Sequence, residues 1–292
     1  MDEITKEVTM FSRKVLLTIL AGLLLILPAG LGGCAKEVSA QEITDNVLLA
    51  YPKIDTFKLN MNLTMAMAIE SGTEQMEMNV TGTAAGQINS ADNEMQIAIN
   101  MAADLSGQGS QNISEEIYVV GGQSYMKMSI LGFDQWFKMD IPEEIWNQQN
   151  QLEQQVEFLR NAIEVTKLGE ETVDGVNCYI LQITPDLDAM LDWVKAQQQD
   201  VSPDMDLSNI NLNEIFKNLS LKMWVAKDSY LPVKGDIQIT MEILPQDVGA
   251  DASETGKISM DMSAQVKYYD YGKPVTIELP QEALNAPSLP SS

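Results

Sequence analysis

The sequence contains no histidine and only two cysteines among its 292 residues. Without histidine, the Ser-His-Asp and Cys-His arrangements that activate a nucleophile are excluded. The usual zinc ligand sets and the commonest general base are excluded as well. An enzyme built on this chain would have to work with carboxylates, lysine or tyrosine alone. The sequence therefore favours a protein that is not an enzyme and that holds no cofactor.

Positive charge is also scarce. The chain has 18 lysines and arginines against 42 aspartates and glutamates, a net charge of −24. Such a surface repels the phosphates of nucleic acids and the anionic surfaces of most bacterial membranes. We therefore expect no nucleic-acid partner, and we expect any membrane attachment to come from a lipid and not from a basic patch.

Long apolar runs are absent, but a short one lies near the N-terminus. Residues 15–27 are apolar but for one threonine; they follow the basic pair Arg13-Lys14 and precede Leu31-Gly32-Gly33-Cys34. A basic start, an apolar run and small residues before a cut site are typical of a secretory signal peptide. The alternative is a transmembrane anchor, which needs about 20 apolar residues, and this run has 13.

Leu31-Gly32-Gly33-Cys34 resembles the lipobox of bacterial lipoproteins. The resemblance implies cleavage before Cys34, a diacylglyceryl thioether on its sulfur and an acyl chain, such as palmitate, on the new amino group. Several acyl chains, at about 0.8 kcal/mol per buried methylene, anchor a protein stably. We predict a signal peptide at residues 1–33 and a tether at 34–40. The exported protein would be anchored to the outer face of the cell membrane, or to the outer membrane if the host has one.

Lipidation of Cys34 would leave Cys178 without a disulfide partner. Cys178 begins the apolar run Cys178-Tyr179-Ile180-Leu181. A buried and inert thiol is the interpretation that this context favours, and a reactive thiol is the alternative.

The pattern of apolar residues predicts one helix and then a large sheet. Ile43, Val47, Leu48 and Tyr51 share one helical face, which ends at Pro52. Apolar residues then alternate with polar ones in the segments 57–71, 76–88, 95–105, 233–243 and 258–266. The segments 112–120, 124–129, 135–140, 165–172, 178–184 and 219–226 are also predicted to be strands. Strict alternation with turns between is typical of an antiparallel sheet with one wet face. The first three strands exceed the usual length, so we expect a twisted, curved sheet.

Two further helices are predicted, at residues 143–163 and from Asp186 to about residue 199. No linker interrupts residues 41–279, and we predict a single α+β domain at 41–282 followed by a flexible tail at 283–292.

Several short segments together resemble the LolA/LppX-like bacterial lipoproteins. They are Ile117-Tyr118, Tyr125-Met126-Lys127, Trp136-Phe137-Lys138-Met139-Asp140, Val173-Asp174-Gly175-Val176, Trp224-Val225-Ala226-Lys227-Asp228 and Tyr269-Asp270-Tyr271-Gly272. The resemblance covers most of residues 41–282. It implies an incomplete antiparallel barrel wrapped around two or three helices, an apolar cavity between them, and the handling of lipids or lipoproteins. The chain departs from the soluble carriers of this family at Cys34, which would anchor it.

Methionine is abundant, with 18 residues. Many lie on the apolar side of the predicted strands, where they could fill a core or form an adaptable wall around an apolar ligand. A copper site is a third interpretation, since Cu(I) accepts thioethers, but methionines two residues apart line a sheet and do not converge. The predicted ligand-lining residues are Leu59, Met61, Leu63, Met65, Met67, Met76, Met78, Val80, Met95, Ile97, Ile99, Met101, Met241, Met260 and Met262.

No metal site is predicted. Asp204-Met205-Asp206-Leu207-Ser208 is similar to the start of a calcium loop, but Asn209 replaces the glycine at its sixth position and Ile215 the glutamate at its twelfth. The function that the sequence favours is a membrane-anchored lipoprotein that binds a hydrophobic ligand, a lipid, between a sheet and its helices. The alternative is a structural or protein-interaction module with a filled core. The sequence names no protein partner.

Overall fold

The computed structural model describes residues 37–71, 74–106, 109–130, 132–140, 159, 162–189, 191, 211–248 and 256–288. The chain divides into two compact units, Met1–Val38 and Ser39–Ser292. All described helices and strands belong to the second unit. Within these residues, no helix has the length and apolar character needed to cross a membrane.

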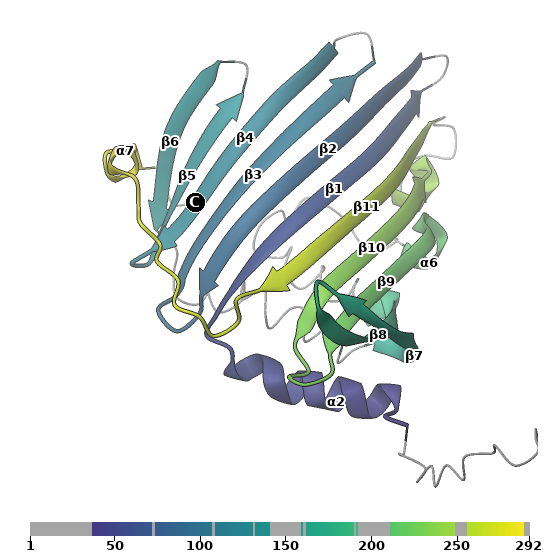
Figure 1. Cartoon of the computed structure of the whole chain (residues 1–292). Coiled ribbons are helices and arrows are strands. Elements are labelled where there is room, and N and C mark those ends of the chain that lie inside the picture. The colour runs from purple at the N-terminus through teal and green to yellow at the C-terminus, as the bar shows by residue number, and fades with distance from the viewer. Residues whose placement is uncertain are drawn as a thin grey trace, which may run out of the picture. The chain divides into compact units, whose positions relative to one another are not determined.

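Eleven described strands form one antiparallel sheet (Figure 1). Their order across the sheet is β6-β5-β4-β3-β2-β1-β11-β10-β9-β8-β7, so β6 and β7 are the two edges. The strands are β1 (Thr56–Ser71), β2 (Glu74–Asn89), β3 (Glu94–Leu105), β4 (Gly109–Val120), β5 (Gln123–Ile130), β6 (Phe133–Asp140), β7 (Ala162–Val173), β8 (Val176–Pro185), β9 (Phe216–Ala226), β10 (Pro232–Ile243) and β11 (Lys257–Tyr269). The predicted open antiparallel sheet is therefore confirmed.

The sheet consists of two meanders joined by one long-range pair. Strands β1 to β6 follow one another outward, and β7 to β11 return from the other edge until β11 lies beside β1. The β1–β11 ladder runs from Lys58 opposite Tyr269 to Glu70 opposite Lys257. Strands that follow one another in the sequence form the other pairs, so within the sheet this one ladder joins the two halves.

Helix α2 (Ala40–Ala50) and the 3-10 helix η1 (Tyr51–Lys53) lie against one end of the sheet (Figure 1). The hydroxyl of Ser39 accepts a hydrogen bond from the backbone N–H of Glu42 and so caps the helix. Ile43, Val47 and Tyr51 are buried, as the predicted helical face requires. Tyr51 joins a core cluster with Phe57 and Ile88, and the aromatic rings of Phe57 and Tyr271 stack with centroids 6.0 Å apart.

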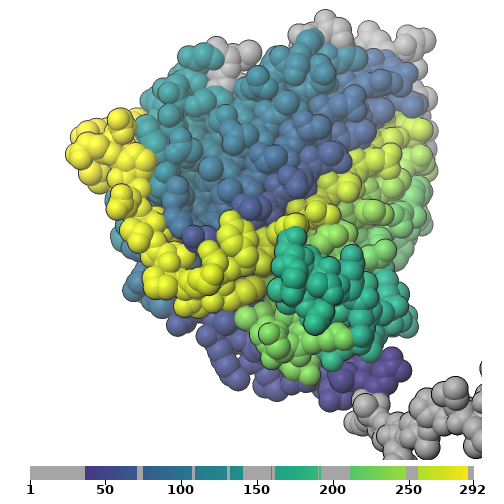
Figure 2. Space-filling model, viewed as in Figure 1, coloured from purple at the N-terminus to yellow at the C-terminus, as the bar shows by residue number. Residues whose placement is uncertain are grey.

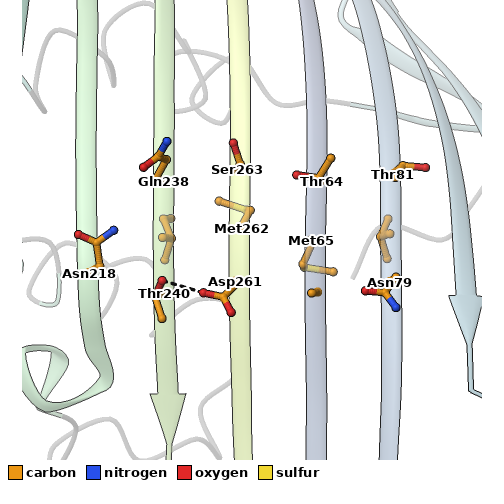
Figure 3. A pocket seen from close by; sticks show the side chains of 13 residues that line it. Thr64, Met65, Asn79, Thr81, Asn218, Gln238, Thr240, Asp261, Met262 and Ser263 are labelled. Carbon is orange, nitrogen blue, oxygen red and sulfur yellow. Dashed lines mark hydrogen bonds between the residues drawn. The ribbon is translucent and has the colours of Figure 1, made fainter.

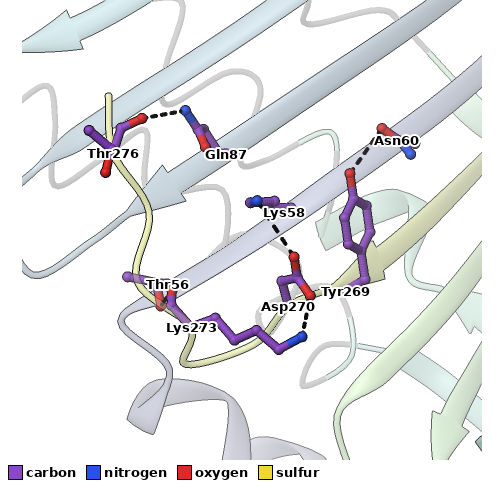
Figure 4. Close-up of polar contacts among 8 residues, drawn as sticks. All are labelled: Thr56, Lys58, Asn60, Gln87, Tyr269, Asp270, Lys273 and Thr276. Atoms are coloured by element: carbon purple, nitrogen blue, oxygen red, sulfur yellow. Dashed lines mark hydrogen bonds and ion pairs between the residues drawn. The ribbon is translucent and has the colours of Figure 1, made fainter. Parts of the chain in front are cut away.

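The residues after β11 form a C-terminal strap, residues 270–288, which crosses the polar face of the sheet (Figure 2). Its backbone accepts hydrogen bonds from Thr56 Oγ1 at Lys273 and from Gln87 Nε2 at Thr276, both at 2.8 Å (Figure 4). Lys273 donates to Asp270 at 2.6 Å, and this bond, helped by Lys58, lowers the pKa of the Asp270 carboxyl.

The strap ends at β6, where the sequence analysis placed a flexible tail. The short helix α7 (Gln281–Leu284) inserts Ala283, which is fully buried, against Tyr118 and Tyr125. The backbone N–H of Lys138 then donates to the carbonyl of Pro287 at 3.0 Å. Residues 283–288 therefore pack against the sheet and occupy part of the hydrogen-bonding edge of β6.

The predicted helices are only partly described. The helix predicted at 143–163 lies mostly outside the described residues, and its last position is wrong. Ile163 belongs to β7, because the ladder between β7 and β8 begins at Ala162 opposite Pro185. At this position the pairing with β8 determines the backbone conformation, and the helical spacing of the apolar residues does not. The helix predicted from Asp186 begins as expected, since Asp186 Oδ1 accepts from the N–H groups of Asp188 and Ala189 at 3.0 Å. Helix α6 (Leu212–Ile215) directly precedes β9.

Candidate ligand-binding face

The strand registers place all the predicted lining residues on one face of the sheet. Met65 lies opposite Val80 on β2 and opposite Met262 on β11. One step along, Met67 lies opposite Met78 and Met260, and Met260 lies opposite Met241 on β10. Because side chains alternate across a strand, residues paired in this way point to the same side. We call this side the apolar face.

Burial changes along the apolar face from one end of the strands to the other. At the end where β1 begins, Phe57 is 3% exposed and Ile88 on β2 is 6% exposed, because α2 and η1 pack over them. At the opposite end of the same two strands, Ile69 is 38% exposed and Met76 is 49% exposed. We call these the covered end and the open end.

Between the two ends the predicted lining side chains are mostly half-buried. This holds for Met61, Met65 and Met67 on β1 and for Met260 and Met262 on β11, whereas Val80 is buried. A filled core would bury such side chains fully, and a bare surface would expose them. Methionine suits a position of this kind because its unbranched side chain can adopt many shapes around a ligand.

The apolar face extends further than the sequence analysis predicted. Ile97 lies opposite Ile117 on β4, which lies opposite Met126 on β5 and, beyond it, Phe137 on β6. The period of two is weaker in these strands than in β1, because apolar or aromatic residues such as Tyr118 and Trp136 also lie on the other face. The same alternation places Glu115 on this face, opposite Ile99, and the sequence analysis missed it.

The other face of the sheet carries a polar hollow of about 400 Å³ (Figure 3). Its walls are polar side chains of five adjacent strands, and the hydroxyl of Thr240 donates to Asp261 at 2.7 Å. The small side chain of Ala66 lies between Asn79 and Asp261 and leaves the space open. Met65 and Met262 border the hollow with their backbone, since their side chains point to the apolar face. The lining residues are Thr64, Met65, Ala66, Asn79, Val80, Thr81, Asn218, Gln238, Ile239, Thr240, Asp261, Met262 and Ser263.

The thiol of Cys178 is buried, as predicted. Its side chain lies in a cluster with Val173 and Trp224. Burial raises the pKa of the Cys178 thiol, so the nucleophilic thiolate is disfavoured. The indole N–H of Trp224 donates to Glu171 at 2.6 Å, and the ammonium of Lys234 lies 4.0 Å from the centroid of the Trp224 ring. These contacts fit a packing role for Cys178.

Other candidate residues fall outside the described part of the chain. Leu31, Gly32, Gly33 and Cys34 are among them, as are residues 204–210 of the calcium-loop resemblance. Within the described residues, no group of three or more aspartate, glutamate, cysteine or histidine side chains could hold a metal ion.

Solved structures similar to this chain include the proteins that the sequence resemblance names. Lipoprotein LppX of Mycobacterium tuberculosis is 13% identical, with 82% of this chain and 98% of that chain covered and a TM-score of 0.37. LprF of Mycobacterium bovis is 13% identical, with 82% and 96% covered and a TM-score of 0.38. A LolA superfamily protein of Nitrosomonas europaea is 14% identical, with 83% and 96% covered and a TM-score of 0.21. The resemblance is thus confirmed as a similarity, and at these TM-scores we take nothing about function from it.

A search of curated protein sequences finds no match. The sequence matches a family of unknown function, DUF6612, over residues 39–288, from the N-cap of α2 to the end of the strap. The match spans well over half of the chain, and the chain belongs to the DUF6612 family.

Proposed function

We propose that this protein is an exported lipoprotein, anchored through Cys34, that binds a lipid or another apolar ligand on the apolar face of its sheet. The observation that carries the proposal is the state of this face, which is covered at one end, open at the other and half-buried between them. A ligand lying along the strands would remove apolar area from water, at about 25 cal/mol per Å². Methionine-rich walls tolerate ligands of varied shape, so selectivity for the apolar part would be low.

The alternative is a module without a ligand that acts through its outer surface. Its support is the polar hollow, where Thr64, Thr81 and Ser263 lie directly opposite one another across the strands. Within the described residues these side chains form no hydrogen bonds, whereas Gln265 and Asp236 nearby on the same face are bonded at 3.0 Å. A polar partner could occupy such positions.

Lipid extraction separates the two functions. The full chain carrying Cys34→Ala would be purified without detergent, so that no covalent lipid contributes to the signal. Native mass spectrometry and solvent extraction should then find a lipid bound in about equimolar amount. A chain that carries no lipid, and that takes up none from vesicles, would support the module instead.

Membrane attachment through Cys34 has a separate test. Cys34→Ala should move the protein from the membrane fraction to the soluble fraction, because the acyl chains would be the only anchor of so acidic a chain. Cys178→Ala is the matched control, and that variant should stay with the membrane. The measurement is fractionation followed by a wash in high salt, which removes electrostatically bound protein. Retention of Cys34→Ala after this wash would contradict the anchor.

A further inference from the structure

Among the described side chains of strands β3 to β6, a single carboxylate interrupts the apolar face. On β4, Ile113, Glu115, Ile117 and Val119 point to this side, since each lies opposite an apolar-face residue of β3. Glu115 lies between Ile99 on β3 and Met128 on β5, since β4 runs between these two strands (Figure 1). Within the fully described strands β3, β4, β5 and β6, it is the only charged residue on this face.

Glu115 also has no partner among the described residues, whether by hydrogen bond or by ion pair. Its neighbour Glu116 points to the polar face and is fully engaged there. Glu116 accepts a hydrogen bond from the Tyr118 hydroxyl at 3.2 Å and lies 3.8 Å from the ammonium of Lys127. Glu116 on the polar face therefore has a counter-charge, whereas Glu115 on the apolar face has none among the described residues.

Glu115 lies nearer the covered end of the apolar face than the open end. A row of opposed residues runs across the sheet from Met61 through Ala84 and Ile99 to Glu115. Glu115 is thus three strands from Met61, about 14 Å at the usual strand spacing. Its row lies four residues along β1 from Phe57 at the covered end and eight residues from Ile69 at the open end. A ligand on this face would reach it.

A ligand that covers Glu115 takes its carboxylate out of water. With a purely apolar ligand, the charge would be buried without a partner, which opposes binding. With an anionic head group, repulsion from Glu115 and from a chain of net charge −24 would be added. An ammonium group would supply the missing counter-charge as a charge-assisted hydrogen bond.

We propose that the ligand of the apolar face is an amphiphile whose head group carries an ammonium, and that Glu115 binds this group. The inference rests on the proposed function and specifies its ligand. The ammonium could belong to a phospholipid or to a simple alkylamine, and the chemistry that Glu115 recognises is common to both.

The test compares probes that differ only in their head group. The full chain carrying Cys34→Ala would be titrated with dodecylamine and with dodecanol, and with lysophosphatidylethanolamine and its N-acetylated form. We expect each amine to bind about tenfold or more tightly than its neutral or anionic counterpart, as a charged hydrogen bond predicts. Glu115→Gln should abolish that ratio and strengthen the binding of dodecanol, because the ligand no longer covers an unpaired charge; retained dodecanol binding also shows that the variant is folded. Glu116→Gln, on the other face, should keep the ratio.

The outcomes are distinct. Loss of the ratio in Glu115→Gln alone supports the inference, and the probe pair that shows it tells a phospholipid head group from a bare amine. If the unsubstituted face binds amines and their counterparts equally, the inference is wrong and the proposed function stands. If no probe binds, the proposed function fails as well.

Discussion

Replacing Met65 with aspartate is expected to weaken the binding of an apolar ligand about a hundredfold. Met65 lies at the centre of the apolar face, opposite Val80 and Met262, and its side chain is half-buried. The substitution removes an apolar contact and adds a charge that a bound ligand would cover. The two effects together cost about 3 kcal/mol, which is roughly a hundredfold in Kd.

Thr64→Asp provides a matched control for Met65→Asp. Thr64 is the preceding residue of the same strand, but its side chain points to the polar face and is exposed. The Thr64→Asp substitution adds the same charge to the chain as Met65→Asp. It should change the affinity for the apolar ligand by no more than about twofold, because surface charges are screened. Titration of both variants with dodecanol, each carrying Cys34→Ala, measures the difference. Equal losses in the two variants would mean that the ligand does not lie on the apolar face.

The strands were predictable because their pattern is local. Each long strand alternates apolar and polar residues over its own length, and the turns between β1 and β6 join neighbours in sequence. The pairing of β1 with β11 carries no such signal. It joins residues about 200 positions apart, and only the tertiary structure brings Met65 beside Met262. The sequence could therefore assign the lining residues to apolar faces without showing that these faces are one.

The C-terminal strap shows where composition misleads. Proline, serine and alanine between residues 280 and 292 are typical of a loose tail. In the structure, the small side chain of Ala283 in the strap packs against the rings of Tyr118 and Tyr125. That fit depends on the shape of the sheet surface, which no property of the tail itself reveals. Glu115 was missed for a different reason, since the predicted strand at 112–120 was not divided into its two faces, and only the pairing with Ile99 shows on which side Glu115 lies.

The covered end and the open end of the apolar face differ in burial. At the covered end, burial raises the pKa of the Tyr51 and Tyr271 hydroxyls, so both stay neutral. The Tyr271 hydroxyl donates to the carbonyl of Pro232 at 2.7 Å, which ties the start of the strap to β10. At the open end, apolar side chains face water instead. Stability should therefore be concentrated at the covered end, and ligand access at the open end.

Substitutions at the two ends of β1 test this division. Phe57→Ala should lower the free energy of unfolding by about 3 to 5 kcal/mol, the usual cost of removing a buried phenylalanine. Phe57 is 3% exposed, packs with Tyr51 and Ile88, and stacks on Tyr271. Removing its ring leaves a cavity where α2, the sheet and the strap meet, so the loss should be near the upper part of this range.

Ile69→Ala is the control, because Ile69 lies on the same strand and the same face but is 38% exposed. Its loss should stay below about 2 kcal/mol, since more than a third of the side chain is already in contact with water. Urea denaturation of both variants, followed by fluorescence, gives the two values. A similar loss in both variants would show that the apolar face is stabilised evenly along its length, and the open end would then be an ordinary part of the core.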